Sequence, residues 1–265
     1  MQPAVVAHRG ASAHRAEHTL AAYALALDQG ADGLECDVRL SRDGHLVCVH
    51  DRTVDRTSNG RGVVSTLTLA ELSELDYAGW HGGLPDNADE LITTRNSHNE
   101  IGVLTLDELL GLVVERPGKK LFIETKHPVR YGALVEAKLV AMLHRFGLAT
   151  PKSKEDSQVL MMSFSVRAVR RVRQHAPGLP TVELLHDFSP TTRDGALSSG
   201  ADYTGPSIRM LRNDPGYVAR AAAHGHPTYC WTVDKPEDVE LCRRLGVRYV
   251  ATNRPAATRE TLAAG

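Results

Sequence analysis

Four short motifs hold most of the side chains that could do chemistry in this chain of 265 residues. Each motif lies in or ends an apolar, β-branched run that is typical of a buried strand. The motifs are His8-Arg9, Glu35-Cys36-Asp37, His50-Asp51 and Glu124-Thr125-Lys126. Together they supply imidazoles that can carry protons, carboxylates that can bind cations, and cations that can bind an anion.

The spacing within two of these motifs indicates a metal site. Residues two apart on a strand face the same side, so Glu35 and Asp37 point one way together, as do Glu124 and Lys126. If both pairs face one axis, three carboxylates converge and repel each other unless a cation lies between them. Because hard oxygen ligands suit Mg²⁺ or Ca²⁺ better than zinc, the sequence predicts one divalent cation, Mg²⁺ or Ca²⁺.

The elements that must position these motifs alternate along the chain. Amphipathic helical stretches separate most of nine strand-like segments, a pattern typical of βα units and a parallel sheet. The strand-like segments lie at 4–8, 33–38, 46–50, 121–125, 159–164, 181–185, 201–205, 227–233 and 248–252.

The connection between the second and third segments decides how these strands are arranged. The stretch 38–46 is too short for a parallel crossover, and it contains Asp43-Gly44, a hairpin turn signal. The third strand is therefore expected to run antiparallel, which leaves eight strands for a (β/α)₈ TIM barrel; an open doubly wound sheet is the alternative. A two-residue turn at Asp43-Gly44 would place Asp37 opposite His50.

A barrel would bring the four motifs together, because its active site lies at the carboxyl ends of the strands. Each residue alone could have an ordinary structural role, such as a surface ion pair, but four successive strands with such groups favour a site. The stretch 51–103 does not fit the repeat and is rich in turn-forming residues, with one expected helix at 68–76. We expect an insertion over the barrel mouth within a single domain, 1–265.

Composition limits the possible partners. The chain is 42% hydrophobic and 24% charged, with a net charge of -1 and a sequence pI near 6.9, values that do not indicate a nucleic-acid binder. The opening residues lack a signal-peptide pattern and no apolar run is long enough to span a bilayer, so we expect a cytoplasmic protein without stable membrane insertion. Four scattered cysteines are expected to be buried free thiols: Cys36, Cys48, Cys230 and Cys242.

The order of the motifs resembles the glycerophosphodiester phosphodiesterase family. That family's opening pattern of HRG, a Glu-Asn-Thr-like stretch, ExD, a DG turn and an HD pair is matched by "AHRG", "EHT" and "GADGLECDVRLSRDGHLVCVHD". Later, "FIETK" is similar to its ExK motif, "MMSF" to its Ser-Phe strand and "CWTVD" to its Trp-Thr strand. The similarity spans nearly the whole chain.

The resemblance implies a barrel enzyme that hydrolyses a small-molecule glycerophosphodiester to glycerol 3-phosphate and an alcohol. The implied residues are the metal ligands Glu35, Asp37 and Glu124, the acid/base pair His8 and His50, and the substrate-binding residues Arg9, Lys126 and Trp231. Either water attacks the phosphorus directly, or the neighbouring glycerol hydroxyl attacks first and water opens a cyclic phosphate. The headgroup, the choice of ion, the roles of the two histidines and the oligomeric state stay open.

Two residues depart from the family pattern. His18 stands where the family usually has Asn, and Asn253 stands where an acidic residue is common. Both bear on substrate choice if they lie at the barrel mouth. In the expected insertion, Trp80, His81 and His98 could contact substrate, but solvated histidines are the more ordinary interpretation of such a loop.

Two alternative functions share the same motifs. A sphingomyelinase D-like phospholipid phosphodiesterase would have similar HRG, ExD and HD signals, but such proteins are secreted, and their substrate calls for an apolar rim that this polar insertion does not offer. A catalytically silent barrel that binds a phosphate metabolite would typically have lost a ligand or a histidine.

Overall fold

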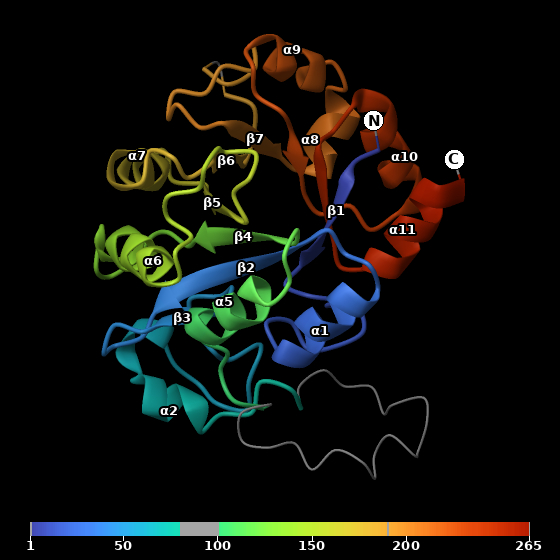
Figure 1. Cartoon of the computed structure of the whole chain (residues 1–265). Helices are drawn as coiled ribbons and strands as arrows, with labels where there is room; N and C mark the ends of the chain where they lie inside the picture. Colours follow the sequence, from blue (N-terminus) through green and yellow to red (C-terminus); the bar gives the residue numbers. More distant parts are fainter. Residues whose placement is uncertain (1, 80–100, 190, 265) are drawn as a thin grey trace.

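A computed structural model describes residues 2–79, 101–189 and 191–264. Within them, eight parallel strands form a barrel, and Figure 1 shows the arrangement of the elements. The strands follow the order β7-β6-β5-β4-β2-β1-β9-β8, and bridges between Thr204 and Thr228 and between Ser207 and Trp231 join β7 to β8. The sheet therefore closes on itself, which confirms the expected barrel and rules out the open doubly wound sheet. The strand bounds are β1 Ala4–His8, β2 Gly33–Leu40, β4 Lys120–Thr125, β5 Val159–Ser163, β6 Thr181–Leu185, β7 Tyr203–Pro206, β8 Tyr229–Cys230 and β9 Tyr249–Thr252.

Helices surround the barrel, in the stretches between the strands (Figure 1). Thr105 begins α5 with a capping box, its side chain accepting from the Glu108 N–H while the Glu108 carboxylate accepts from the Thr105 N–H. The bounds are α1 Leu20–Asp28, α5 Leu106–Val114, α6 Leu134–Arg145, α7 Val166–His175, α8 Ile208–Asn213, α9 Tyr217–Ala223, α10 Pro236–Leu245 and α11 Pro255–Ala264.

The strand β3 (Leu46–Cys48) pairs antiparallel with β2, as expected, but in a different register. Leu40 lies opposite Leu46 and Val38 opposite Cys48, and the Val49 N–H donates to the Asp37 carbonyl oxygen. The predicted pairing of Asp37 with His50 is therefore wrong by one residue. The turn contains three residues, 42–44, and ends at Gly44 with φ of 84°, the left-handed conformation that closes such a loop.

Apolar side chains fill the barrel interior below the site. Val6, Phe122, Leu160, Met162 and Tyr229 belong to one buried cluster inside the barrel. Two residues further along, β1 carries His8 and β4 carries Glu124, on the same face of each strand. The change from apolar to polar inward residues thus occurs at the carboxyl ends of the strands, where a barrel places its site.

The described part of the insertion packs on β3 and not as a separate core. It contains a short 3₁₀ helix, η1 (Val64–Thr66), and α2 (Leu69–Ser73), which confirms the expected helix at 68–76. Val54 and Leu72 pack with Val47 of β3 in a small apolar cluster. Trp80, His81 and His98 lie outside the described residues.

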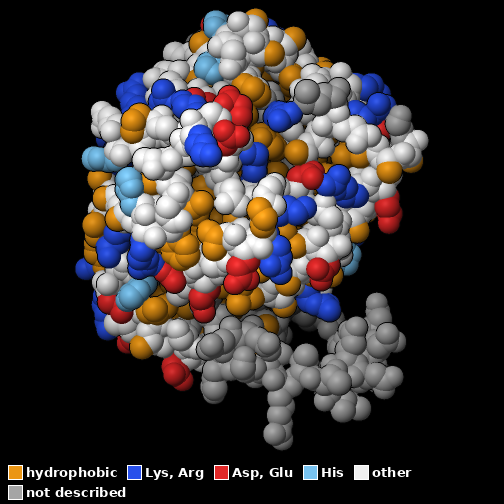
Figure 2. All heavy atoms as spheres, in the orientation of Figure 1, with side chains coloured by type: hydrophobic (Ala, Val, Ile, Leu, Met, Phe, Trp, Pro, Cys, Tyr) orange, Lys and Arg blue, Asp and Glu red, His pale blue; other side chains and the backbone are white. Residues whose placement is uncertain are grey.

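Two further expectations concern the whole chain. The four cysteines are buried and free. Among the residues that the structure describes, no helix has the length and apolarity needed to cross a membrane. On the face shown in Figure 2, described acidic and basic side chains are interspersed over the surface.

Candidate active site

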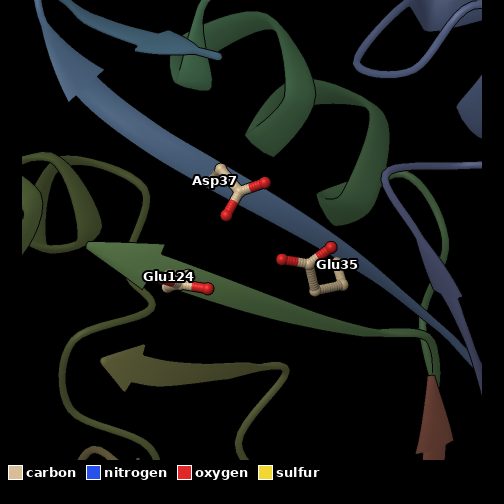
Figure 3. Close-up of side chains that lie close together, drawn as sticks. All are labelled: Glu35, Asp37 and Glu124. Atoms are coloured by element: carbon tan, nitrogen blue, oxygen red, sulfur yellow. The ribbon is translucent and has the colours of Figure 1, made fainter. Parts of the chain in front are cut away.

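Three carboxylates meet between β2 and β4 at the mouth of the barrel (Figure 3). Asp37 and Glu124 are register partners on these neighbouring strands, and Glu35 lies two residues earlier on β2. One oxygen from each residue lies within 4.8 Å of the others, and all three side chains are buried. The expected convergence of Glu35, Asp37 and Glu124 is therefore present.

Asp37 is the centre of the surrounding charge network. Its Oδ2 atom lies 2.9 Å from Arg9 Nε and 3.1 Å from His18 Nε2, and its Oδ1 atom lies 3.2 Å from Lys126 Nζ. Although burial opposes ionisation, the charges of Arg9 and Lys126, with the hydrogen bond from His18, hold the pKa of Asp37 well below its usual range. Asp37 thus stays ionised inside the protein.

Glu35 and Glu124 are less well compensated. Burial, reinforced by the charge of Asp37, raises the pKa of Glu35 well above its usual range and that of Glu124 to about 7. Glu124 has one direct cation contact, 2.8 Å from Lys126 Nζ, and Glu35 accepts a hydrogen bond from the Arg9 backbone N–H. Three buried carboxylates therefore share two cationic side chains.

Because carboxylates outnumber cations in this site, a metal ion could supply the missing positive charge. The converging donors are all carboxylate oxygens, the hard ligands that Mg²⁺ and Ca²⁺ prefer. A divalent cation beside Glu35 and Glu124 would offset the repulsion that raises their pKa values. The residues present therefore fit a divalent cation.

His8 ends β1 and is held by a chain of polar side chains. Its Nδ1 atom lies 2.8 Å from Asn253 Oδ1, and the Asn253 amide nitrogen donates to Asp234 at 2.7 Å. The Ser12 hydroxyl also lies within hydrogen-bond distance of Asn253 Oδ1. Burial, with the nearby charge of Arg9, lowers the pKa of His8 to about 3, so the ring is neutral near pH 7.

His50 has a different environment. Its Nδ1 atom lies 2.6 Å from a carboxylate oxygen of Asp51, and Arg56 lowers the pKa of Asp51 to about 2. Arg56 also binds Glu17, whose other contact is Arg9. Burial still lowers the pKa of His50, but Asp51 opposes that effect, because a neighbouring carboxylate stabilises the imidazolium.

His18 lies in the charge network and not in a substrate pocket. It is 5% exposed, and its second ring nitrogen lies 2.8 Å from the Tyr23 hydroxyl, which donates to the Glu35 carbonyl oxygen. Arg9 and His18 both have φ near 60°, which is uncommon for residues other than glycine, and the His18 N–H donates to the Arg9 carbonyl oxygen. This strained turn places both side chains on Asp37.

A cavity of about 50 Å³ lies beside the carboxylates and collects the expected residues. Its lining includes His8, Arg9, Glu35, His50, Glu124, Lys126, Phe164 and Trp231. The Trp231 indole N–H donates to the Gly205 carbonyl oxygen, and the ring meets Phe164 edge-to-face at 5.4 Å between centroids. Trp231 therefore lines the cavity with a fixed orientation. Arg9 and Lys126 face the same cavity, although both are also paired with Asp37.

Several residues of the network were not identified from the sequence. Glu17 and Arg56 lie in the "EHT" and "DRTVDRT" segments, and Asp234 follows the Trp-Thr strand. Asn253 was noted only as a departure from a pattern. Polar residues that follow strands β8 and β9 were the available signal for Asp234 and Asn253.

A closed (β/α)₈ barrel with buried carboxylates, cations and two histidines at the carboxyl ends of its strands defines a barrel enzyme suited to an anionic substrate. Residues 8–257 match the model of the glycerophosphoryl diester phosphodiesterase family, and the chain belongs to that family.

Individual relatives agree with this family. The chain is 54% identical to a probable glycerophosphodiester phosphodiesterase 1 of Mycobacterium tuberculosis, over 99% of this chain and 93% of the relative. It is 35% identical to a glycerophosphodiester phosphodiesterase of Bacillus subtilis, over 94% and 83% of the two chains. The fold is shared with a phosphodiesterase of Oleispira antarctica solved in complex with its product sn-glycerol-3-phosphate, at a TM-score of 0.84, 24% identity, and 99% and 97% coverage.

Proposed function

We propose that this chain hydrolyses glycerophosphodiesters to glycerol 3-phosphate and an alcohol, with a divalent cation, Mg²⁺ or Ca²⁺, held by Glu35, Asp37 and Glu124. The family membership and the names of relatives at 54% and 35% identity support the reaction. The observation that carries the chemistry is the joint lining of one cavity by two histidines, two cations and two of the three carboxylates. When bound, the cation would supply Lewis-acid stabilisation of charge on the phosphoryl oxygens.

The substrate phosphate would be held by Arg9 and Lys126. Both cations line the small cavity, and the phosphodiester adds the negative charge that such cations stabilise as it grows in the transition state. Trp231 and Phe164 give the cavity an apolar wall against which a glycerol carbon skeleton can pack.

His8 would act as the base. Because the Asn253 amide nitrogen donates to the Asp234 carboxylate, its carbonyl oxygen faces His8 and accepts from Nδ1–H. The proton of the neutral ring is therefore on Nδ1, and Nε2 holds a free electron pair. His8 at Nε2 would take a proton from the attacking oxygen, which is either water or the neighbouring glycerol hydroxyl.

His50 would act as the acid. The ionised Asp51 accepts from Nδ1–H and stabilises the protonated ring, whose Nε2–H can then be given to the departing alcohol oxygen. Across the whole reaction, one P–O bond to the headgroup breaks, the oxygen of water becomes bonded to phosphorus, and the headgroup leaves as its alcohol. A cytoplasmic location remains a prediction from the sequence.

The test is release of glycerol 3-phosphate from glycerophosphocholine and glycerophosphoethanolamine, with Mg²⁺, with Ca²⁺ and with EDTA. Metal-dependent release that is lost in His8→Ala is the expected result. If neither ion supports release while the protein still binds metal and glycerol phosphate, the silent-barrel alternative replaces the proposal. ³¹P NMR during turnover separates the two routes, since only attack by the glycerol hydroxyl produces a cyclic phosphate.

A further inference from the structure

A second cavity, larger than the one in the candidate active site, is lined by three arginines. It has a volume of about 560 Å³, against about 50 Å³ for the cavity that holds the histidines, and lies between the insertion and the segment after β4. Three separate segments of the chain each contribute one arginine to its lining: Arg39 of β2, Arg52 of the insertion and Arg130 after β4. Its size falls within the range of roughly 300–1,000 Å³ that is typical of ligand pockets.

Arg39 connects this cavity to the catalytic one. Its Nε and one terminal nitrogen donate to the His50 carbonyl oxygen at 3.0 and 2.8 Å. Arg39 lies two residues beyond Asp37 on β2, so both side chains leave the same face of the strand. Arg39 lines the larger cavity, His50 lines the small one, and the two residues are in contact, so the two cavities lie next to each other. A substrate whose phosphorus lies beside His50 could therefore reach the larger cavity.

The charge of this cavity is one-sided. The lining comprises Arg39, Arg52 and Arg130 with apolar and neutral polar residues, and it contains no Asp or Glu among the residues described. Arg52 and Arg130 are exposed, and within the described residues neither makes an ion pair with a carboxylate. The Arg130 guanidinium instead stacks on Tyr131, 5.7 Å from the ring centroid. Cations left without carboxylate partners in a pocket favour an anionic ligand.

We propose that this cavity, hereafter the arginine pocket, binds the headgroup of the substrate and selects headgroups that carry a second phosphate over neutral or cationic ones. This inference rests on the proposed function and adds the substrate class to it. The phosphodiester has two arms: the glycerol arm fits the small cavity beside Trp231, and the headgroup arm enters the arginine pocket past His50. Planar guanidinium groups match a phosphate in charge and geometry.

A matched pair of substrates tests the proposal, because glycerophosphoinositol and glycerophosphoinositol 4-phosphate differ only in the second phosphate. The wild-type kcat/KM is expected to be about tenfold higher for the phosphorylated substrate. Arg52→Gln and Arg130→Gln should each reduce that preference by about two- to fivefold, through KM, since exposed charge contacts are of modest strength. Arg167→Gln, an exposed arginine on α7 outside the arginine pocket, is the control.

Equal kcat/KM for the two substrates would overturn the proposed role of the arginine pocket. So would a preference that persists in the double variant Arg52→Gln with Arg130→Gln. Direct binding of glycerophosphoinositol 4-phosphate, by calorimetry in EDTA, separates this failure from failure of the proposed function. If the protein hydrolyses neither substrate but binds the phosphorylated compound more tightly, and the double variant loses this preference, the proposed function is wrong and the arginine pocket stands. If the protein shows neither hydrolysis nor tighter binding of the phosphorylated compound, the proposed function and the arginine pocket are both wrong.

Discussion

Asn253 determines which nitrogen of His8 can accept a proton. Its carbonyl oxygen lies 2.8 Å from His8 Nδ1, while its amide nitrogen donates to Asp234, which fixes the orientation of the carboxamide. A histidine held by a neutral amide keeps its orientation without gaining the electrostatic support that a carboxylate would give to the imidazolium. Asn253 therefore orients His8, while burial and the charge of Arg9 keep the ring neutral near pH 7.

Replacement of Asn253 by Asp should change the pH dependence of the reaction. A carboxylate beside Nδ1 would raise the pKa of His8 from about 3 by roughly 1 to 3. The acid limb of kcat/KM should then move to higher pH in Asn253→Asp, measured at saturating metal. Ser12→Ala removes another contact to the same oxygen without adding charge, so it should leave the limb in place. An unchanged acid limb in Asn253→Asp would argue against His8 as the base.

Removal of the carboxylate beside His50 should impair departure of the alcohol. In Asp51→Asn the imidazolium loses its acceptor, and kcat for glycerophosphocholine should fall at least roughly tenfold, because general acid catalysis typically contributes more than that. A p-nitrophenol leaving group departs without a proton, so kcat for a substrate that carries it should fall much less in Asp51→Asn. Equal losses with both substrates would show that His50 does not act as the acid.

The raised pKa of Glu124 should appear as a pH-dependent stability of the metal-free protein. Its pKa is about 7 in the fold and about 4.5 in the unfolded chain, so its contribution is present below pH 4.5 and lost as the pH rises through 7. In EDTA, Glu124→Gln should therefore match the wild type near pH 4 and exceed its stability by up to about 3 kcal/mol at pH 8.

Comparison of these two proteins by urea unfolding isolates the carboxylate. His8, whose lowered pKa acts in the opposite direction between about pH 3 and pH 6.5, is present in both proteins and cancels in the difference. Saturating Mg²⁺ or Ca²⁺ should remove the advantage of the variant at pH 8, because the cation binds the wild-type carboxylates in the native state. A stability difference that does not vary with pH would contradict the raised pKa.

The barrel and the central residues of the site could be predicted because their signals are local. Period-two spacing places Glu35 with Asp37 on one face of β2, and the rule for parallel barrels brings the strand ends together. The hairpin register could not be predicted in this way, because Asp43-Gly44 is compatible both with a two-residue turn and with a three-residue turn that ends at Gly44. That difference of one residue displaced His50 from its expected partner.

The contacts that decide chemical roles were harder to predict. Asn253 lies 245 residues from His8 in the sequence, and its role follows from the orientation of its amide, which depends on Asp234. Arg39 reads as an ordinary polar residue of a strand, and only the fold places it beside Arg52 and Arg130. Such residues act through long-range side-chain geometry that no spacing rule along the chain records.

The glycine of the first motif has a steric role that a paired substitution can test. Gly10 has φ of 87°, and a Cβ atom there would lie 2.7 Å from Ala22 of α1, so Gly10→Ala should lower the free energy of unfolding by about 2–4 kcal/mol. Gly111 lies within α5 with no atom within 4 Å of a built Cβ, and Gly111→Ala should raise it by about 0.5–1 kcal/mol. Thermal and urea unfolding of both variants measure these opposite changes. If Gly10→Ala were as stable as the wild type, α1 would not pack as closely on the turn that carries His8 and Arg9 as the structure requires.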